Sequence, residues 1–350
     1  MTTRIDALSD AHERLSGYAY VDGPGFAVHA PMGAEALSSA GYDDLVATWI
    51  EAYKASHEPI PAPPRGDAID GRDEASWRPA LGQVARASDW AVLFDRELRD
   101  EPWPSVLTRW LPRLLPGHAG GLTHGLLRTA HAVRALPVQA PAPDLLLAEL
   151  ARGLAYWAAT FRSLPGEPHL RGPLGLEAAI AAVPRPREPW NPVEAGTFAR
   201  IGELTGFGQA VAAHGLPEAS DEALSELTAA FCRLVLSGPP AVIGPIHAVT
   251  PAVAVRTLLP YLPSLAVEAV YARLWHVGAA IVAGFVPPDA ALPPAADPAP
   301  APAAILARAA EHRDTHAIKF AEACVREHAL RPDPVYLLAA QHVLDTLPAW

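Results

Sequence analysis

The sequence predicts an all-α protein, a single large domain of roughly ten helices joined by proline-rich loops. In long segments rich in Ala and Leu, apolar residues recur at the spacing of amphipathic helices. Segments that alternate Val, Ile or Thr with polar residues, as strands do, are nearly absent. Hydrophobic residues make up 50% of the 350 residues and charged residues 19%, so the chain can bury a sizeable core.

Helical spacing runs through most of the chain. Helices are expected at residues 31–41, 44–56, 121–136, 143–164, 222–238, 251–262, 264–285, 305–330 and 334–347. Proline-rich stretches separate many of these segments, and proline interrupts helices because it lacks a backbone N–H. No change of composition accompanies the stretches. We therefore expect one domain spanning residues 1–350, with a proline-rich surface loop at residues 286–303.

Charge and hydropathy limit the partners. The formal net charge of −11 argues against nucleic-acid binding, which needs a basic face. The longest uncharged run, residues 234–255, contains four prolines, so we do not expect a membrane helix there. The polar N-terminus lacks the apolar segment of a signal peptide. These features predict a soluble cytoplasmic protein that binds neither nucleic acid nor a membrane.

The familiar catalytic motifs are missing, which directs attention to the 14 histidines. There is no glycine-rich nucleotide fingerprint, no G-x-S-x-G and no H-E-x-x-H. Seven histidines lie near polar residues or proline-rich stretches and are expected at the surface: His12, His57, His118, His169, His214, His328 and His342.

Three further histidines, His29, His124 and His247, share a different setting. Each follows a turn marked by Gly or Pro and precedes or opens an apolar helix, and Thr250 and Pro251 are expected to cap and begin the third helix. A helix N-terminus lowers the pKa of a histidine and keeps it neutral, which is the form that binds metals. Capping or core packing is the alternative interpretation for each.

Residues 315–324, "THAIKFAEAC", contain one of only two lysines, Lys54 and Lys319, among 27 basic residues. We expect His316 in the middle of a helix, with Lys319 three residues on and on the same face; His312 could join them. Lys319 either extends its ammonium to water or, if buried and neutral, adds CO2 to become a carbamate that binds metal. Arginine does not lose its proton and could not do so. Asp314 is the rival anion.

Five motifs resemble, in the same order, those of the questin oxidase-like family. They are "FAVHAPMGAEAL", "GLTHGLLRTAHAVRAL", "IHAVTPAVAVRTLLPYL", "THAIKFAEAC" and "YLLAAQHVLDTL", and the resemblance runs from about Tyr18 to Leu347. Members of this family are associated with oxidative ring opening of anthraquinone-type polyketides. The chemistry has been assigned both to NADPH-linked Baeyer–Villiger oxidation and to non-haem iron with histidine ligands and a carbamylated lysine.

The resemblance implies specific site residues. It places the metal ligands at His29, His124, His247, His316 and Lys319. The sequence departs from the family where many fungal members have a second histidine and this chain has Arg128. Arg128 and His131 follow His124 by four and seven residues, so they share its helix face and are candidate catalytic residues that contact substrate or a metal ligand.

The resulting expectation is an oxygenase with one Fe(II) per chain that uses O2 to oxidise an aromatic polyketide or similar planar metabolite. Because the chain lacks a nucleotide-binding fingerprint, we favour the metal mechanism over bound NADPH or flavin. Three alternatives stay open: an NADPH-dependent Baeyer–Villiger-type oxidase, a metal-dependent hydrolase or lyase, and a non-catalytic helical binding protein in which the histidines are core residues.

Overall fold

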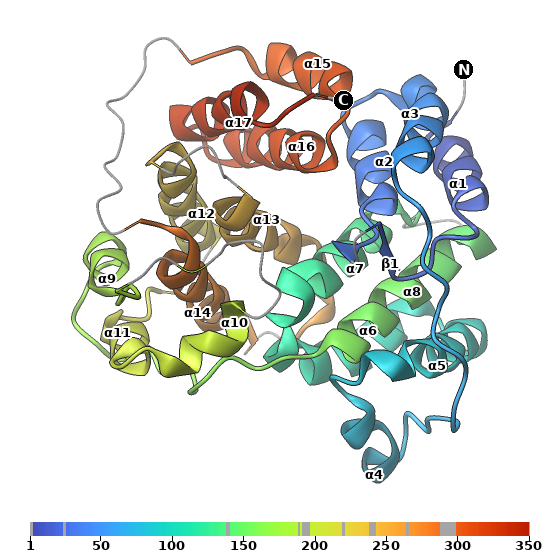
Figure 1. Cartoon of the computed structure of the whole chain (residues 1–350), viewed down its shortest axis with the longest axis horizontal. Coiled ribbons are helices and arrows are strands. Elements are labelled where there is room, and N and C mark those ends of the chain that lie inside the picture. Colours follow the sequence, from blue (N-terminus) through green and yellow to red (C-terminus); the bar gives the residue numbers. More distant parts are fainter. Residues whose placement is uncertain are drawn as a thin grey trace. The chain divides into compact units, whose positions relative to one another are not determined.

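A computed structural model of the chain describes residues 3–23, 26–137, 141–187, 190, 197–218, 221–237, 243–263, 266–287 and 299–349. These residues are mostly helical, which confirms the all-α class (Figure 1). The helices outnumber the roughly ten that were expected. The described strands, β1 (Val21–Asp22) and β2 (Phe26–Ala27), pair antiparallel with Val21 opposite Ala27.

The helices pack into two compact units. Unit 1 consists of Met1–Ser163 and Ala254–Leu262, and unit 2 of Leu164–Val253 and Pro263–Trp350. The expectation of one domain over residues 1–350 stays a prediction. Most of the expected loop at residues 286–303 lies outside the described residues, and its last two residues belong to a helix.

Unit 1 is built around a central pair of helices, α7 and α8, which lie side by side with α5 packed on α8 (Figure 1). Helices α1, α2 and α3 pack on one another beside them. The helices are α1 (Arg4–Arg14), α2 (Ala30–Ser39), α3 (Asp43–Ser56), α4 (Glu74–Trp77), α5 (Ala87–Asp100), α6 (Trp103–Leu114), α7 (His124–Ala135) and α8 (Asp144–Thr160), with short 3₁₀ turns η1 (Arg78–Ala80), η2 (Val84–Arg86), η3 (Leu115–Gly117), η4 (Gly120–Thr123) and η6 (Leu259–Tyr261).

Two glycines let α7 and α8 approach closely. A Cβ added at Gly125 would lie 2.5 Å from the Cα of Trp157, and one at Gly153 would lie 3.1 Å from the Cα of Thr129. Larger side chains would push the helices apart, because interiors are close-packed. This contact fixes the start of α7, where His124 lies.

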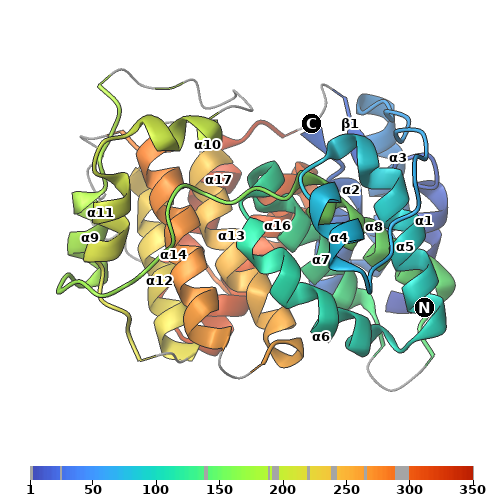
Figure 2. The ribbon, with the colours of Figure 1, turned by 90° about the horizontal axis from the view of Figure 1, so that it is seen from below.

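Unit 2 contains longer helices and several short ones. Helices α15, α16 and α17 pack on one another (Figure 1), and α12 lies beside α14 (Figure 2). The elements are α9 (Leu176–Ala182), α10 (Thr197–Arg200), η5 (Ile201–Glu203), α11 (Phe207–Ala213), α12 (Asp221–Ser237), α14 (Ala266–Phe285), α15 (Pro302–His312), α16 (Thr315–Leu330) and α17 (Pro334–Thr346). Helix α13 (Ile243–Leu258) has residues in both units.

Two helix boundaries differ from those expected. The single helix expected at residues 305–330 is two helices, because Arg313 adopts a left-handed conformation (φ 69°) that ends α15 and Asp314 then caps α16. In the other case α13 begins at Ile243 and continues through Pro251, so Thr250 is not a cap and Pro251 is not a first residue. The Thr250 hydroxyl instead donates to the carbonyl of Ile246, one turn earlier.

Seven described helices lie outside the segments expected from the sequence: α1, α4, α5, α6, α9, α10 and α11. In α5, the apolar residues Trp90, Leu93, Phe94 and Leu98 form one buried stripe among charged residues. Such a narrow stripe is weaker than the broad Ala/Leu pattern of the central helices. The extra helices raise the count without changing the fold class.

Candidate functional site

Two of the expected metal ligands meet in unit 1. His29 lies at the N-cap of α2 and His124 is the first residue of α7. Their Nε2 atoms are 2.9 Å apart, and the ring planes meet at 74° with centroids 4.6 Å apart. The expectation that both residues stand at the start of an apolar helix is therefore confirmed, and the fold brings their side chains together.

Backbone carbonyls determine the tautomer of both rings. The Nδ1 of His29 lies 2.5 Å from the carbonyl oxygen of Ala27, and the Nδ1 of His124 lies 2.6 Å from that of Gly121. A carbonyl oxygen only accepts hydrogen bonds, so both Nδ1 atoms carry the proton and donate it. In the neutral rings each Nε2 then presents a lone pair, and the two lone pairs face each other across 2.9 Å. That arrangement favours a cation between them.

A buried tyrosine holds the backbone of His29 in place. The backbone N–H of His29 donates to the hydroxyl of Tyr53 on α3 at 3.2 Å, and this hydroxyl donates to Asp22 on β1 at 2.5 Å. Burial raises the pKa of Asp22 and that of Tyr53. Neither residue was predicted from the sequence. Tyr53 has the pattern of an ordinary buried helix residue, and only the fold brings Asp22 next to it.

Unit 2 brings together His247, His316 and Lys319. The rings of His247 and His316 have centroids 5.5 Å apart at 67°, and the charge of Lys319 contributes to lowering the pKa of His247. His247 lies inside α13, one turn after its start, and donates Nδ1–H to the carbonyl of Ile243 at 2.6 Å. Its Nε2 therefore also presents a lone pair. Burial lowers the pKa of His247 to about 4, so the ring is neutral at neutral pH.

The position of His316 differs from the one expected. It is the second residue of α16, not a mid-helix residue. Asp314 caps the same helix by accepting from the backbone N–H of Ala317 at 3.0 Å, and its carboxylate lies 3.9 Å from Nδ1 of His316. Asp314 therefore serves the helix end. His312 ends the preceding helix, and its Nε2 lies 2.9 Å from the carbonyl of Leu347.

Lys319 is buried, with 4% of its surface exposed. Burial lowers its pKa to about 7, while the carboxylate of Asp314 acts in the opposite direction. A large share of the side chain is therefore a neutral amine at neutral pH, the form that adds CO2. This burial disfavours the interpretation in which the ammonium extends into water.

Arg128, one of the two candidate catalytic residues, lies on the buried face of α7 in an ion pair. Its guanidinium donates two hydrogen bonds to Glu149 on α8, at 2.6 and 2.9 Å, and a third to the carbonyl of Ala19 at 2.7 Å. Burial alone would raise the pKa of Glu149, but the charge and hydrogen bonds of Arg128 lower it. These contacts account for the burial of Arg128, and its catalytic role stays a prediction.

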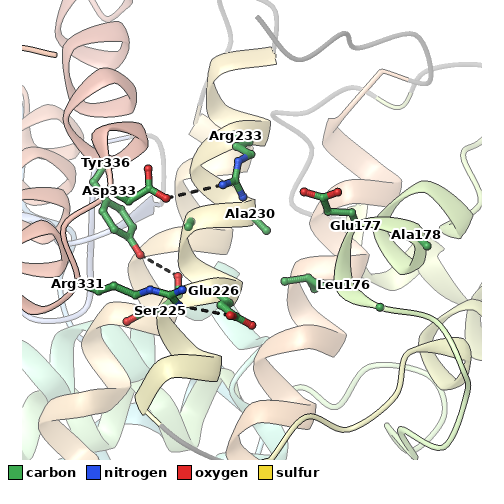
Figure 3. A pocket seen from close by; sticks show the side chains of 12 residues that line it. Leu176, Glu177, Ala178, Ser225, Glu226, Ala230, Arg233, Arg331, Asp333 and Tyr336 are labelled. Atoms are coloured by element: carbon green, nitrogen blue, oxygen red, sulfur yellow. Dashed lines mark hydrogen bonds and ion pairs between the residues drawn. The ribbon is translucent and has the colours of Figure 1, made fainter. Parts of the chain in front are cut away.

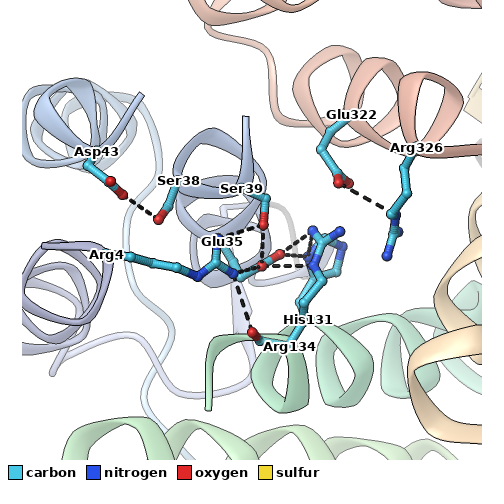
Figure 4. A network of polar contacts seen from close by, with 9 residues as sticks. All are labelled: Arg4, Glu35, Ser38, Ser39, Asp43, His131, Arg134, Glu322 and Arg326. Atoms are coloured by element: carbon cyan, nitrogen blue, oxygen red, sulfur yellow. Dashed lines mark hydrogen bonds and ion pairs between the residues drawn. The ribbon is translucent and has the colours of Figure 1, made fainter. Parts of the chain in front are cut away.

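His131, the other candidate, joins a network around the buried carboxylate of Glu35 (Figure 4). Its Nδ1 lies 2.6 Å from Glu35 Oε2, and Arg4 and Arg134 donate to the same carboxylate at 2.5 and 2.8 Å. Burial would raise the pKa of Glu35, but Arg134 and His131 hold it well below its usual value. The network ties α1, α2 and α7 together, and a catalytic role for His131 also stays a prediction.

Three histidines expected at the surface are buried: His12, His118 and His214. Each belongs to a packed helix or turn whose neighbours in space come from distant parts of the sequence. His12 on α1, for instance, lies 4.0 Å from Glu149 on α8. The two cysteines, Cys232 and Cys324, form no disulfide and are buried.

Unit 2 also contains a cleft that the sequence did not indicate (Figure 3). Its volume is about 530 Å³, and its walls come from the start of α9, from α12 and from the turn between α16 and α17. Arg233 lies 3.8 Å from Asp333, and Arg331 lies 3.5 Å from Glu226. The carboxylate of Glu177 projects from α9 on the other side (Figure 3). The size is within the range of small-molecule sites.

Comparison with known proteins adds no family. No protein-family model matches the chain, and comparison with the curated proteins gives no match. Within the described part of the chain, no helix combines the length and the apolar character needed to cross a membrane. The resemblance to the questin oxidase-like family therefore rests on the sequence motifs alone.

Proposed function

We propose that the protein is a metal-dependent oxygenase that uses Fe(II) and O2 to oxidise a planar aromatic metabolite. In this proposal the His29–His124 pair of unit 1 and the His247–His316–Lys319 group of unit 2 are metal-ligand groups. The observation that carries it is the pair of Nε2 atoms at 2.9 Å, each on a ring whose Nδ1–H is donated to a carbonyl.

This donor set fits a metal ion. Metal-ligating histidines characteristically donate their second ring N–H to a carbonyl or carboxylate, which fixes the ring and the tautomer. Metal–imidazole bonds are about 2.0–2.1 Å long, so two nitrogens 2.9 Å apart can contact the same ion. In unit 2, His247 has the same carbonyl tether, and Lys319 as a carbamate would add the negative charge that neutral imidazoles lack.

Each residue has a defined task in the proposed site. The carbonyls of Ala27 and Gly121 orient the two rings of unit 1, and the Tyr53 hydroxyl fixes the backbone of His29. Burial of His247 keeps its ring neutral, and burial of Lys319 lowers its pKa to about 7, so that a large share of the side chain is neutral amine. Bound iron would supply a redox-active centre for O2 chemistry.

The choice of an oxygenase rests on the family resemblance and on the donor set. Imidazole ligands suit iron, and the chain lacks a glycine-rich fingerprint for NADPH or flavin. O2 uptake is the direct test: protein reconstituted anaerobically with Fe(II) should consume O2 when given a hydroxyanthraquinone or an anthrone. Strict dependence on NADPH, together with tight NADPH binding, would support the Baeyer–Villiger alternative instead.

A metal-dependent hydrolase is the second candidate, and the buried Lys319 favours it, because carbamylated lysines also bind metals in hydrolases. The two functions differ in the metal that supports them. A hydrolase should work with redox-inert Zn(II) and without O2, whereas the oxygenase should be active only with a redox-active metal and O2.

A further inference from the structure

Among the described residues, left-handed backbone at non-glycine positions occurs in short segments in front of two candidate ligands. In the described part of the chain, the non-glycine residues with positive φ are Leu122, Thr123 and Arg313. Leu122 and Thr123 immediately precede His124, and Arg313 lies three residues before His316. Left-handed backbone is unfavourable for residues with a Cβ, and such strain persists where the surrounding structure imposes it, often at functional sites.

The turn before His124 is the stronger case. Gly121, Leu122 and Thr123 are left-handed in succession, with φ of 56°, 52° and 67°. Threonine is β-branched and rarely adopts this region. This left-handed turn directs the carbonyl of Gly121 toward the His124 ring. The carbonyl oxygen accepts the Nδ1–H of His124 at 2.6 Å.

Packing against α8 holds the turn in this shape. A Cβ added at Gly120 would lie 1.8 Å from the carbonyl oxygen of Thr160, and one at Gly121 would lie 2.9 Å from the hydroxyl of Tyr156. Thr123 is fully buried, and its hydroxyl donates to the carbonyl of Leu122 at 2.6 Å. The turn therefore cannot relax without moving α7 away from α8.

Arg313 makes a similar junction in unit 2. Its left-handed conformation ends α15 and lets Asp314 begin α16 as an N-cap, which places His316 in the first turn of the new helix. In both units the strained residue sets where the ligand-bearing helix begins.

We propose that these strained junctions are positioning elements, with Thr123 holding the ring of His124 in one orientation and one tautomer, and Arg313 setting the place of His316. The part concerning metal binding rests on the proposed function. Glycine at a junction should remove the strain and so stabilise the fold, while its freer backbone should loosen the ligand. If a junction only supports the fold, a substitution that stabilises the protein should not weaken metal binding.

Paired substitutions isolate the effect. Thr123→Gly and Thr123→Ala both remove the buried hydroxyl and methyl groups, and they differ in the freedom of φ. Alanine is ordinarily the more stabilising of the two residues in helices. At this position the metal-free glycine variant should melt about 2 °C or more above the alanine variant. Arg313→Gly and Arg313→Ala should give the same order.

Two further measurements test positioning. Thr123→Gly should bind Co(II) about 10-fold more weakly than Thr123→Ala, comparable to the loss of a group that orients a ligand. In metal-free protein, ¹⁵N NMR of labelled histidine should show one Nδ1–H tautomer for His124 in the alanine variant and a mixture in the glycine variant. The reverse substitution Gly206→Ala, at a left-handed glycine (φ 86°) with open space around an added Cβ, should lower the melting temperature and leave Co(II) affinity unchanged.

The outcomes separate the claims. A glycine variant that melts at or below its alanine partner would show that the junction is not strained and would overturn the inference. If the glycine variant melts higher as expected, but both variants bind Co(II) equally well and show the same His124 tautomer, the positioning role is overturned. If the wild-type protein binds no Co(II), the proposed function fails, and the tautomer of His124 still decides whether Thr123 positions the ring.

Discussion

The Nε2 atoms of His29 and His124 lie 2.9 Å apart while both rings donate their Nδ1–H to backbone carbonyls. Neither neutral ring can then donate a hydrogen bond to the other. A cation bound by both Nε2 atoms would hold the two rings together, so the pair should be a site where metal stabilises the fold.

Metal binding should therefore raise the melting temperature through this pair. Co(II) at about 100 times its dissociation constant should stabilise the wild-type protein by about 2.7 kcal/mol, and a chelator should remove the effect. In His29→Gln the metal-induced shift should fall sharply. His118→Gln, at another buried histidine of unit 1, is the control and should keep the shift. Equal shifts in both variants would exclude the pair as a ligand group.

Lys319 should tolerate neither Ala nor Arg if it binds metal as a carbamate. Arginine keeps the charge and most of the stem, but it cannot lose its proton. Both Lys319→Ala and Lys319→Arg should lose bound metal, and small carboxylates or bicarbonate should partly restore it in the alanine variant. Metal content with and without added acetate measures this. An arginine variant with the metal content of the wild type would contradict the carbamate.

His276 should make unit 2 sensitive to acid. Burial, helped by the charge of Arg273, lowers its pKa from 6.5 to about 4, although the carbonyl of Pro165 and the carboxylate of Glu167 act in the opposite direction. Between these pH values His276 is protonated in the unfolded chain but not in the folded chain. The free energy of unfolding therefore falls as the pH falls from about 6.5 to 4. The loss attributable to this group is about 3 kcal/mol.

Urea unfolding of the metal-free protein across this pH range measures the effect. His276→Phe should remove part of the pH dependence while retaining an aromatic ring beside Phe207, whose centroid lies 5.7 Å from that of His276. An unchanged pH dependence in this variant would show that His276 is not the source.

Arg128 and Glu149 should behave as a buried structural pair. Arg128→Met leaves a buried carboxylate without its partner and should cost about 3–5 kcal/mol. The double variant Arg128→Met/Glu149→Leu removes both charges and should recover most of the stability. If the double variant binds metal like the wild type, the pair supports the fold alone. Recovered folding with lost O2 uptake would restore the catalytic role expected from the sequence.

The contact between α7 and α8 should not accept a methyl group. Gly125→Ala places a Cβ 2.5 Å from the Cα of Trp157 and should destabilise the protein by about 1–3 kcal/mol. Gly208→Ala, in helix α11 with open space around the added methyl, should be neutral or stabilising. Similar effects from the two substitutions would mean that close packing does not fix α7.

Local patterns in the sequence carry the fold class and part of the candidate site. The spacing of Ala and Leu predicted the helices, and the glycines before His124 and Pro31 after His29 predicted that both histidines begin helices. Local signals misplaced His247 and His316. Pro251 is the usual first residue of a helix, yet α13 continues through it, and Arg313 breaks a helix at a position that carries no glycine.

Contacts between distant segments could not be predicted from the sequence. Nothing near Arg128 in the chain indicates Glu149, and nothing near His131 indicates Glu35. Tyr53 and Asp22 are 31 residues apart in the chain, and their side chains meet only in the folded protein. These relationships depend on tertiary packing, which helical periodicity does not specify.

Metal content is the measurement that tests the central claim most directly. Protein reconstituted anaerobically with Fe(II) and desalted should contain about one iron per chain by elemental analysis, the stoichiometry expected from the sequence. His124→Ala should lose most of it, while the buried control histidine of the same unit, His118→Ala, should keep it. Wild-type protein without bound metal, or full iron content in His124→Ala, would contradict the account.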